Sequence, residues 1–488
     1  MRFTLDLSEP MADLTFFSRA AMMRLAVAAG LVLVTTASQA QAQDAIGTPP
    51  TVPQGSFAAP AAPAPAAPAP TATPSAAPAE GVAPAKAAEP EKAAPVKAKA
   101  KPKTRRAAAP AAIALSQDPQ PSLTPQTYER TLKAAARYQA IVASGGWPVV
   151  PKTAKFAPGA TGKAVAMLKQ RLAIEGDLRP DEALGDSFDA ATKAAVQRFQ
   201  VRYGLAHNGI VGPATLAAMN VPAETRLHQL EATVQRLATS RFPFGERYVV
   251  VNIPSASVEA VENGRVFRRY TAVAGDPEHH SPVVETKITA INFNPTWTVP
   301  TSIIKNEIIP KMRKDKGYLA RQGLTLLDRE GKEVSPASID WSGNAALGYT
   351  VRQPEGARNA LGQIRIDMPN SMAVYMHDTP GKHAFSRADR FLSHGCVRVS
   401  DVRQLATWLL DGSNPGWNRS RTDEAIAIGA RKTVNLNTPV PVIWVYLTAY
   451  PLADGTVQFR DDVYKLDTTG ASPGQPPLAS ATPTGGLW

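Results

Sequence analysis

The feature that most limits how this chain can fold is a long segment, residues 43–124, built mainly of alanine and proline. It has too few large apolar side chains to offset the conformational entropy that is lost on folding. We therefore expect an extended, disordered tether with polyproline II character. The folded part of the 488-residue chain must be built from the residues after this tether, up to a second segment, 466–488, that we also expect to be disordered.

Residues 1–42 have the pattern of a secretory signal peptide. Arg19 and Arg24 precede a short apolar run, and the small side chains of Ala40 and Ala42 suit a cleavage site. The run is too short to span a bilayer as a permanent helix. We expect this segment to be cleaved on export, which predicts a periplasmic location, with an uncleaved membrane anchor as the alternative.

The tether also carries half of the formal charge of the chain, which is +12. Residues 86–106 hold eight lysines and arginines against two glutamates. Such a segment is attracted to anionic surfaces, so anionic polymers or headgroups of the cell envelope are expected partners, although a purely solvating role explains the charge equally well. We expect no nucleic acid partner, because an exported protein rarely meets nucleic acid.

The composition changes to amphipathic helix after the tether. Apolar residues recur at helical spacing in residues 125–150, and again in 151–221, which we interpret as a small three-helix domain containing the turn Asn208-Gly209. A linking helix within 222–246 follows. Strand-like segments then begin at Arg247, including 257–262 and 284–293, and Asn263-Gly264 between two of them is a strong hairpin signal.

These patterns predict a multidomain α+β protein. Residues 247–465 form a mostly β sandwich or partly closed barrel, interrupted at about 301–345 by a helical insertion. In the same domain, residues 391–399 are expected to be extended. Ser400 is expected to cap a helix over 401–410 that Gly412 ends.

Cys396 is the only cysteine of the chain. An exported protein has reason to avoid an unpaired thiol, and this one lies beside glycine and histidine instead of among aliphatic side chains. A thiol attacks as the thiolate, so it needs a proton acceptor. His394 would share a face with Cys396 in an extended strand, whereas His377 requires the chain to return across a sheet. A buried structural thiol is the simpler alternative.

The surroundings of Cys396 would favour nucleophilic chemistry. Gly395 leaves room for a substrate to approach the backbone, whose N–H groups can hold an oxyanion. The helix after Ser400 would direct its positive end toward the thiol and lower its pKa. A zinc site built from the histidines, Cys396 and Asp378 is the rival chemistry, but the close paired ligands of structural zinc are missing, so we expect no metal and no cofactor.

His377 together with the string that contains Cys396 resembles the signature of L,D-transpeptidases with a YkuD-type catalytic domain, which cross-link bacterial peptidoglycan. That string is Ser393-His394-Gly395-Cys396-Val397-Arg398. The sequence after His377 and the C-terminal segment 444–464 are similar to the large periplasmic subgroup typified by YcbB, and the resemblance spans 127–467. Many smaller members have glycine where this chain has Asp378, so the group that orients His377 stays open.

The resemblance implies a mechanism. Cys396 attacks the carbonyl of the third stem-peptide residue, His377 takes the thiol proton, and the backbone at Gly395 and Cys396, helped by His394, holds the oxyanion. A second amine resolves the thioester into a 3-3 cross-link. The insertion would be a lid, or alternatively a helix that only packs on the sheet, and carbapenems are expected to inhibit. Candidate substrate-binding residues are Tyr375, Ser393, Arg398, Arg352 and Arg358.

The helical domain 151–221 resembles the peptidoglycan-binding type 1 domain, through Ala195-Val196, Phe199-Gln200, Gly204-Leu205 and the stretch 209–216. This implies binding of glycan or stem peptide, with a spacer role as the alternative. Two other functions remain open. One is a cysteine-dependent wall peptidase, an L,D-carboxypeptidase, with water as the acceptor. The other is a non-catalytic peptidoglycan-binding protein that keeps the fold.

Overall fold

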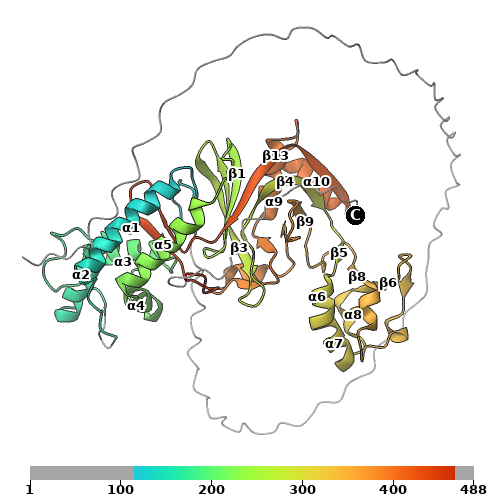
Figure 1. Ribbon diagram of the computed structural model, residues 1–488, viewed down its shortest axis with the longest axis horizontal. Helices are drawn as coiled ribbons and strands as arrows, with labels where there is room; N and C mark the ends of the chain where they lie inside the picture. The colour runs from blue at the N-terminus through green and yellow to red at the C-terminus, as the bar shows by residue number, and fades with distance from the viewer. Residues whose placement is uncertain (1–114, 153, 155, 468–488) are drawn as a thin grey trace, which may run out of the picture. The chain divides into compact units, whose positions relative to one another are not determined.

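The computed structural model of the protein describes residues 115–152, 154 and 156–467 (Figure 1). The expected signal peptide, the basic stretch 86–106 and the tail from residue 468 lie outside the described residues. In the part that is described, no helix is both long enough and apolar enough to cross a membrane.

The end of the expected tether, residues 115–124, is ordered, which corrects the prediction that it is disordered. The amide and hydroxyl of Ser122 donate to the Glu259 carboxylate at 2.7 and 2.9 Å, and Glu259 also pairs with Arg269 at 2.7 Å. The Arg269 guanidinium donates at 2.7 to 2.8 Å to three backbone carbonyls of the segment, those of Ser116, Asp118 and Gln120. Glu259 and Arg269 form a buried ion pair, and the hydrogen-bonding groups that they do not use on each other are satisfied by the backbone of residues 115–124. These hydrogen bonds hold the segment in place.

Five helices follow, as the apolar periodicity predicted. Helices α1 (Thr127–Ala143) and α5 (Ala223–Ala238) pack on each other, and between them in sequence lie α2 (Lys163–Glu175), α3 (Ala190–Arg202) and α4 (Pro213–Met219). Asp189 caps α3, because its carboxylate accepts from the Thr192 amide at 2.7 Å. The core of this helical unit includes Leu168, Leu172 and Phe199, which are fully buried.

This helical core is completed from the other end of the chain. Strands β14 (Ala449–Pro451) and β15 (Val457–Phe459) form an antiparallel hairpin, and Val457 and Phe459 belong to the same buried cluster as the helices. The ring of Phe459 stacks on Tyr203 with centroids 5.3 Å apart. The helices and the C-terminal hairpin therefore share one hydrophobic core.

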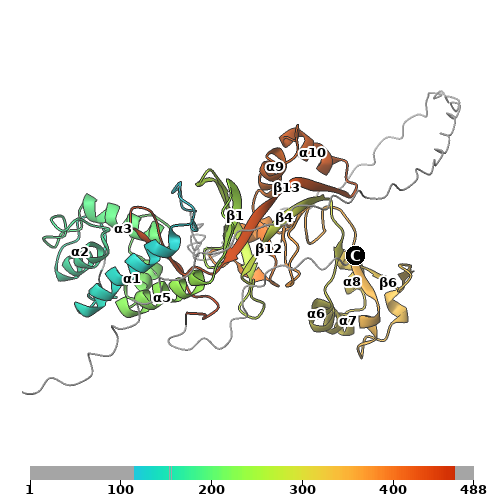
Figure 2. The same cartoon turned by 45° about the horizontal axis from the view of Figure 1, so that its top comes forward.

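In the β domain, several of whose strands are labelled in Figures 1 and 2, strand pairing closes the sheet into a barrel-like ring, which favours the barrel over the sandwich that the sequence left open. Its strand order is β11-β3-β12-β10-β9-β4-β13-β1-β2, and β2 pairs again with β3 to close the ring. The strands are β1 (Arg247–Asn252), β2 (Ser257–Glu262), β3 (Arg265–Gly275), β4 (Val284–Phe293), β9 (Ile364–Asp367), β10 (Met376–His377), β11 (Phe391–Ser393), β12 (Val397–Val399) and β13 (Lys432–Val445).

The bounds expected for β2 and β4 are confirmed, and the β2–β3 hairpin turns at Asn263 and Gly264 with φ of 51° and 71°. Helices α9 (Val402–Asp411) and α10 (Arg419–Ala427) pack on one another, and α9 also contacts β9 and β13. Ser400 does not cap α9, contrary to the prediction. Its amide donates to the Thr271 carbonyl at 2.9 Å as an extension of the sheet, and Asp401 occupies the cap position.

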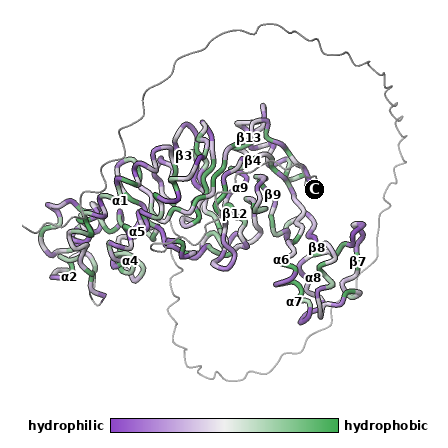
Figure 3. Tube along the Cα trace, in the orientation of Figure 1, coloured by the Kyte–Doolittle hydropathy of each residue, from purple (hydrophilic) through white to green (hydrophobic). Residues whose placement is uncertain are grey.

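The insertion lies between β5 (Trp297–Thr298) and β8 (Thr350–Gln353) and has a core of its own, with Ile308, Met312 and Trp341 buried. The single helix expected there is divided into α6 (Thr301–Ile303), a π-helical turn (Ile304–Ile308) and α7 (Ile309–Lys314), followed by α8 (Tyr318–Gln322). The division coincides with Pro310, which has no amide to donate to the preceding turn. A small sheet, β5-β8-β6-β7, includes β6 (Thr325–Leu327) and β7 (Glu333–Val334), joined by the hydrophilic turn 328–332 (Figure 3).

Candidate active site

Strand pairing brings His377 and Cys396 to the same part of the barrel. Strand β10 runs parallel to β12, with His377 opposite Arg398, while Met376 and Val397 face the buried core. Successive side chains of a strand point to opposite faces, so His377 and Arg398 lie on the face away from that core. Cys396 immediately precedes β12 and is partly exposed. The return of the chain is therefore made by two neighbouring parallel strands.

A cavity of about 430 Å³ lies where the barrel meets the insertion. The barrel contributes Tyr375, His377, Ser393, His394, Cys396 and Arg398 to its wall, and the insertion contributes Ile303, Glu307, Ile308, Tyr318, Gln322 and Leu324. Arg358, from the loop after β8, also lines it, whereas Arg352 and Gly395 are not among the lining residues. The thiol and the imidazole thus open into one hollow.

Residues 394–396 form a bend between β11 and β12, so the extended strand expected over 391–399 is interrupted. The Ser393 hydroxyl donates to the Cys396 carbonyl at 2.5 Å and accepts from the Gly395 amide at 3.3 Å. The Ser281 hydroxyl donates to the Gly395 carbonyl at 2.7 Å. Ser393 therefore closes the turn that presents Cys396, and the Gly395 amide already has a partner.

Gly395→Ala is expected to impair the site. Gly395 has φ of +108°, which side-chain-bearing residues rarely adopt, and an added Cβ would lie 3.3 Å from the His280 carbonyl oxygen. We expect a loss of about 1–3 kcal/mol in the free energy of unfolding, from backbone strain, and slower thioester formation. Thermal unfolding and intact-protein mass measure the two effects. Gly348→Ala, where a Cβ meets nothing within 4 Å, is the matched control, and equal behaviour of the two variants would contradict the prediction.

The group that orients His377 is a backbone carbonyl. The His377 Nδ1 lies 2.5 Å from the carbonyl oxygen of Asp378, which can only accept, so Nδ1 carries the proton and Nε2 is the basic nitrogen. The Asp378 carboxylate plays a different part, because it accepts from the Gln363 amide at 3.0 Å and pairs with Lys382. The Asp378 side chain thus holds a loop, and its carboxylate has the Gln363 amide and Lys382 as partners instead of the imidazole.

Burial sets the protonation of both groups. It lowers the pKa of His377 to about 4, with the positive charge of Arg398 acting in the same direction. It also raises the pKa of the Cys396 thiol, against hydrogen bonding from Tyr375 and the charge of Arg398. Burial therefore acts against the lowering of the thiol pKa that was expected from the following helix. Both shifts favour the uncharged thiol and the uncharged imidazole at neutral pH, so the thiol must lose its proton as it attacks.

The low pKa of His377 predicts an unusual pH profile for the acylation of Cys396. Because the His377 imidazole stays unprotonated until the pH approaches its pKa of about 4, we expect the acylation rate to hold from neutral pH down toward that value. The free energy of unfolding, in contrast, depends on pH in this range. Below about pH 6.5 the imidazole of the unfolded chain binds a proton and the buried one does not, so the folded state loses stability as the pH falls from about 6.5 to about 4. An acid limb near 6.5 in single-turnover acylation would contradict this.

His394 also lines the cavity, but its Nε2 is directed to Glu307 of the insertion, at 2.7 Å from Oε1. Its ring lies beside His279, with centroids 4.4 Å apart. The other oxygen of Glu307 accepts from Lys311 at 2.7 Å. Sequence reasoning did not single out Glu307, because nothing in this amphipathic helical segment indicates which of its charged residues will line the cavity.

The remaining candidates divide by position. The Tyr375 ring lies edge-on to His377 with centroids 5.8 Å apart, and burial raises the pKa of its hydroxyl. Arg398 is partly buried beside the pair, and burial lowers the pKa of its guanidinium. Arg352 lies in β8 outside the cavity lining, where its carbonyl accepts from Thr325 at 3.2 Å. Among the residues from 115 to 467 that have been placed, no three metal-ligating side chains come together.

Two parts of the chain match known domain families. Residues 246–442 match the L,D-transpeptidase catalytic domain, YkuD, and residues 161–219 match the putative peptidoglycan binding domain. The first match contains the cavity residues of both the barrel and the insertion, and the second contains α2, α3 and α4.

Individual relatives cover less of the chain. A putative L,D-transpeptidase of Haemophilus influenzae is 33% identical over 240 residues, which are 49% of this chain and 48% of that protein. A zinc D-Ala-D-Ala carboxypeptidase of Streptomyces albus G is 51% identical over 57 residues, 12% of this chain and 22% of that protein. The chain therefore spans about half the length of the first relative and less than a quarter of the second.

Solved structures show similarity at low identity. An L,D-transpeptidase from Xylanimonas cellulosilytica is 19% identical, with 60% of this chain and all of that chain covered and a TM-score of 0.19. An L,D-transpeptidase from Mycobacterium smegmatis is 17% identical, with 41% and 58% covered and a TM-score of 0.21.

Proposed function

We propose that this chain, which carries a YkuD-type L,D-transpeptidase catalytic domain and a peptidoglycan-binding domain, forms 3-3 cross-links in peptidoglycan through a thioester on Cys396. The observation that carries the proposal is that one free thiol and one imidazole oriented by a backbone carbonyl line the same cavity. A base and a nucleophile that open into the same pocket are what acyl transfer requires.

In this proposal Cys396 attacks the carbonyl of the third stem-peptide residue. The Nε2 of His377 takes the thiol proton as the carbon–sulfur bond forms and returns it to the departing amine of the terminal residue. A backbone amide at the 394–396 bend would hold the oxyanion, an interaction worth about 2.7–4 kcal/mol in other acyl-transfer enzymes. Arg358 and Arg398, which line the cavity, suit the carboxylates of the stem peptide.

The insertion would act as a lid of the kind found in the large YcbB-like subgroup. Six of its residues form one wall of the cavity, and it has a separate hydrophobic core, so it can move as a unit. The helical domain would bind glycan or stem peptide, and the whole protein would work in the periplasm, where peptidoglycan lies. The basic stretch 86–106 would add attraction to anionic envelope polymers.

The test is digestion of purified sacculi after incubation with the full chain, followed by mass analysis of the muropeptides. New dimers linked between two third residues are the expected result. Shortened stem peptides without new dimers would instead indicate an L,D-carboxypeptidase that uses water as its acceptor. Unchanged muropeptides, with no carbapenem adduct on Cys396, would leave only a non-catalytic peptidoglycan-binding protein.

A further inference from the structure

The wall of the cavity carries both positively charged and negatively charged side chains. Arg358 and Arg398 are permanent cations, and the carboxylates of a stem peptide suit them. Among the described residues that line the cavity, Glu307 is the one carboxylate. A transferase with two peptide substrates needs places for two different groups, the carboxylates of the donor and the amine of the acceptor. Glu307 is the group on this wall that attracts a cation.

Glu307 is presented by the π-helical turn Ile304–Ile308, in which the helix widens by one residue. Its side chain is one-third exposed, with Oε1 2.7 Å from His394 Nε2 and Oε2 accepting from Lys311 at 2.7 Å. Burial acts against its charge, but the hydrogen bonds and charges of Lys311 and His394 prevail and lower the pKa of Glu307. The cavity wall therefore carries an anion at neutral pH. The Lys311 side chain is 45% exposed, so its ion pair with Glu307 is weak and an incoming ammonium can displace it.

His394 is placed to handle a proton next to this anion. The His394 Nε2 lies 2.7 Å from Glu307 Oε1, and a ring that carries its proton on Nε2 has a lone pair on Nδ1 that can accept another. The ring is 39% exposed, which leaves a path for a proton to water. The neighbouring ring of His279 has its own carboxylate partner, because its Nδ1 lies 3.0 Å from Asp276 Oδ1. His394 is only two residues from Cys396, whereas the proposed base for the thiol is His377.

We propose that Glu307 and His394 form the binding site for the ammonium group of the acyl acceptor, and that His394 removes one proton from it. This inference rests on the function proposed above. The ammonium gives a proton to His394, which passes it to water. The neutral amine attacks the thioester carbon, a carbon–nitrogen bond forms and the carbon–sulfur bond breaks. The second proton of the attacking nitrogen moves through His377 to the departing sulfur, which restores the thiol.

The test follows the fate of the thioester in the full chain carrying Glu307→Gln, with a tetrapeptide donor. We expect acylation, followed by intact mass, to change less than about twofold, since His377 and Cys396 are untouched. Transfer to a second stem peptide, which arrives as an ammonium, should fall about tenfold or more, mainly through a higher KM for the acceptor. Transfer to hydroxylamine, which is uncharged near neutral pH, should change less than about twofold.

Two further variants make the result decisive. Glu333→Gln removes an exposed carboxylate of the same insertion, on β7 and outside the cavity lining, and should leave all three rates unchanged. Glu307→Asp keeps the charge and should recover part of the transfer to the stem peptide. Equal losses with both acceptors, a matching loss of acylation, or no loss at all would overturn the inference. A wild-type chain that forms no thioester would instead refute the proposed function.

Discussion

The Cys396→Ala variant is expected to form no acyl-enzyme with a stem-peptide donor or a carbapenem and to produce no new cross-links in sacculi. Cys396 is the only sulfur nucleophile of the chain, and within the structure it shares its cavity with the base His377. The loss should therefore reach the background of the assay, since no second thiol can take over. Intact-protein mass after incubation with the donor measures the adduct directly.

The fold of the Cys396→Ala variant should survive, because alanine fits the bend without a positive φ at that position. Its thermal midpoint is the control for unfolding. A residual adduct at the wild-type level would show that another side chain is the nucleophile, and it would refute the proposed function at its first step.

Replacing His377 with alanine separates the base from the nucleophile. We expect acylation to fall by about 10²–10⁴-fold, the usual contribution of a positioned general base, while Cys396 remains open to alkylation by iodoacetamide. His394→Ala should slow acylation less, because its Nε2 is directed to Glu307. The opposite ranking of the two variants in single-turnover acylation would show that the roles of the two histidines are exchanged.

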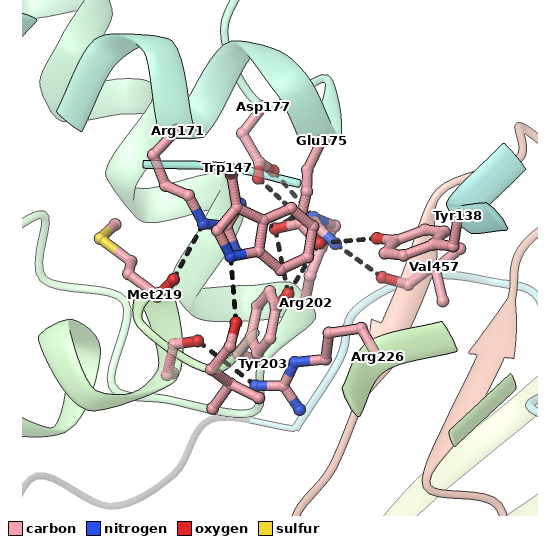
Figure 4. Close-up of polar contacts among 12 residues, drawn as sticks. Tyr138, Trp147, Arg171, Glu175, Asp177, Arg202, Tyr203, Met219, Arg226 and Val457 are labelled. Atoms are coloured by element: carbon pink, nitrogen blue, oxygen red, sulfur yellow. Dashed lines mark hydrogen bonds and ion pairs between the residues drawn. The ribbon is translucent and has the colours of Figure 1, made fainter. Parts of the chain in front are cut away.

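The Glu175→Ala variant is expected to lower the free energy of unfolding by about 3–5 kcal/mol, the usual cost of leaving a buried charge without its partner. That charge is the one on Arg171, since Arg202 keeps its ion pair with Asp177. The Glu175 carboxylate is fully buried and is 2.7 Å from Arg171 and 3.2 Å from Arg202 (Figure 4). It also accepts from the hydroxyls of Tyr138 and Tyr203, at 2.6 and 2.8 Å. These partners hold the pKa of Glu175 far below its ordinary value, although burial acts in the opposite direction.

The effect should spread beyond α2, because Arg202 also donates to the Val457 carbonyl of β15 at 2.8 Å. Urea unfolding of the full chain measures the loss. Asp181→Ala, which breaks an ion pair with Arg179 that is mostly exposed, is the control and should cost less than about 1 kcal/mol. A loss at Glu175 no larger than the loss at Asp181 would mean that the helices relax enough to let water reach the two arginines.

Much of the framework follows from local sequence patterns. Alternation and turn chemistry define β2, β4 and the Asn263-Gly264 hairpin, because these elements depend on neighbours in the chain. The first half of β13 could not be predicted from local pattern, since the part after Lys432 is polar and largely exposed and lacks the apolar alternation of a buried strand. The order of residues 115–124 was missed for a different reason: it depends on Arg269, which is remote in sequence.

The site was predictable only in part. Spacing alone favoured His394 as the partner of Cys396, and the family resemblance was needed to prefer His377. Neither source could show that the chain bends at 394–396, because the bend depends on hydrogen bonds from Ser281 and Ser393 that no periodicity encodes. The direction of the shift in the thiol pKa was also beyond sequence reasoning, since it is set by how deeply the sulfur is buried.

The shared core of the helices and the C-terminal hairpin has a consequence for how the protein must be made. Helix α3 is synthesised long before β15, so the Tyr203 ring cannot stack on Phe459 until nearly the whole chain has been made. Until then the hydrophobic core of the helical unit lacks the side chains of β14 and β15, and the Arg202 guanidinium lacks the Val457 carbonyl that it donates to in the folded protein. A protein truncated before β14 should therefore aggregate and be sensitive to proteases, even though it contains every residue of the 161–219 domain match.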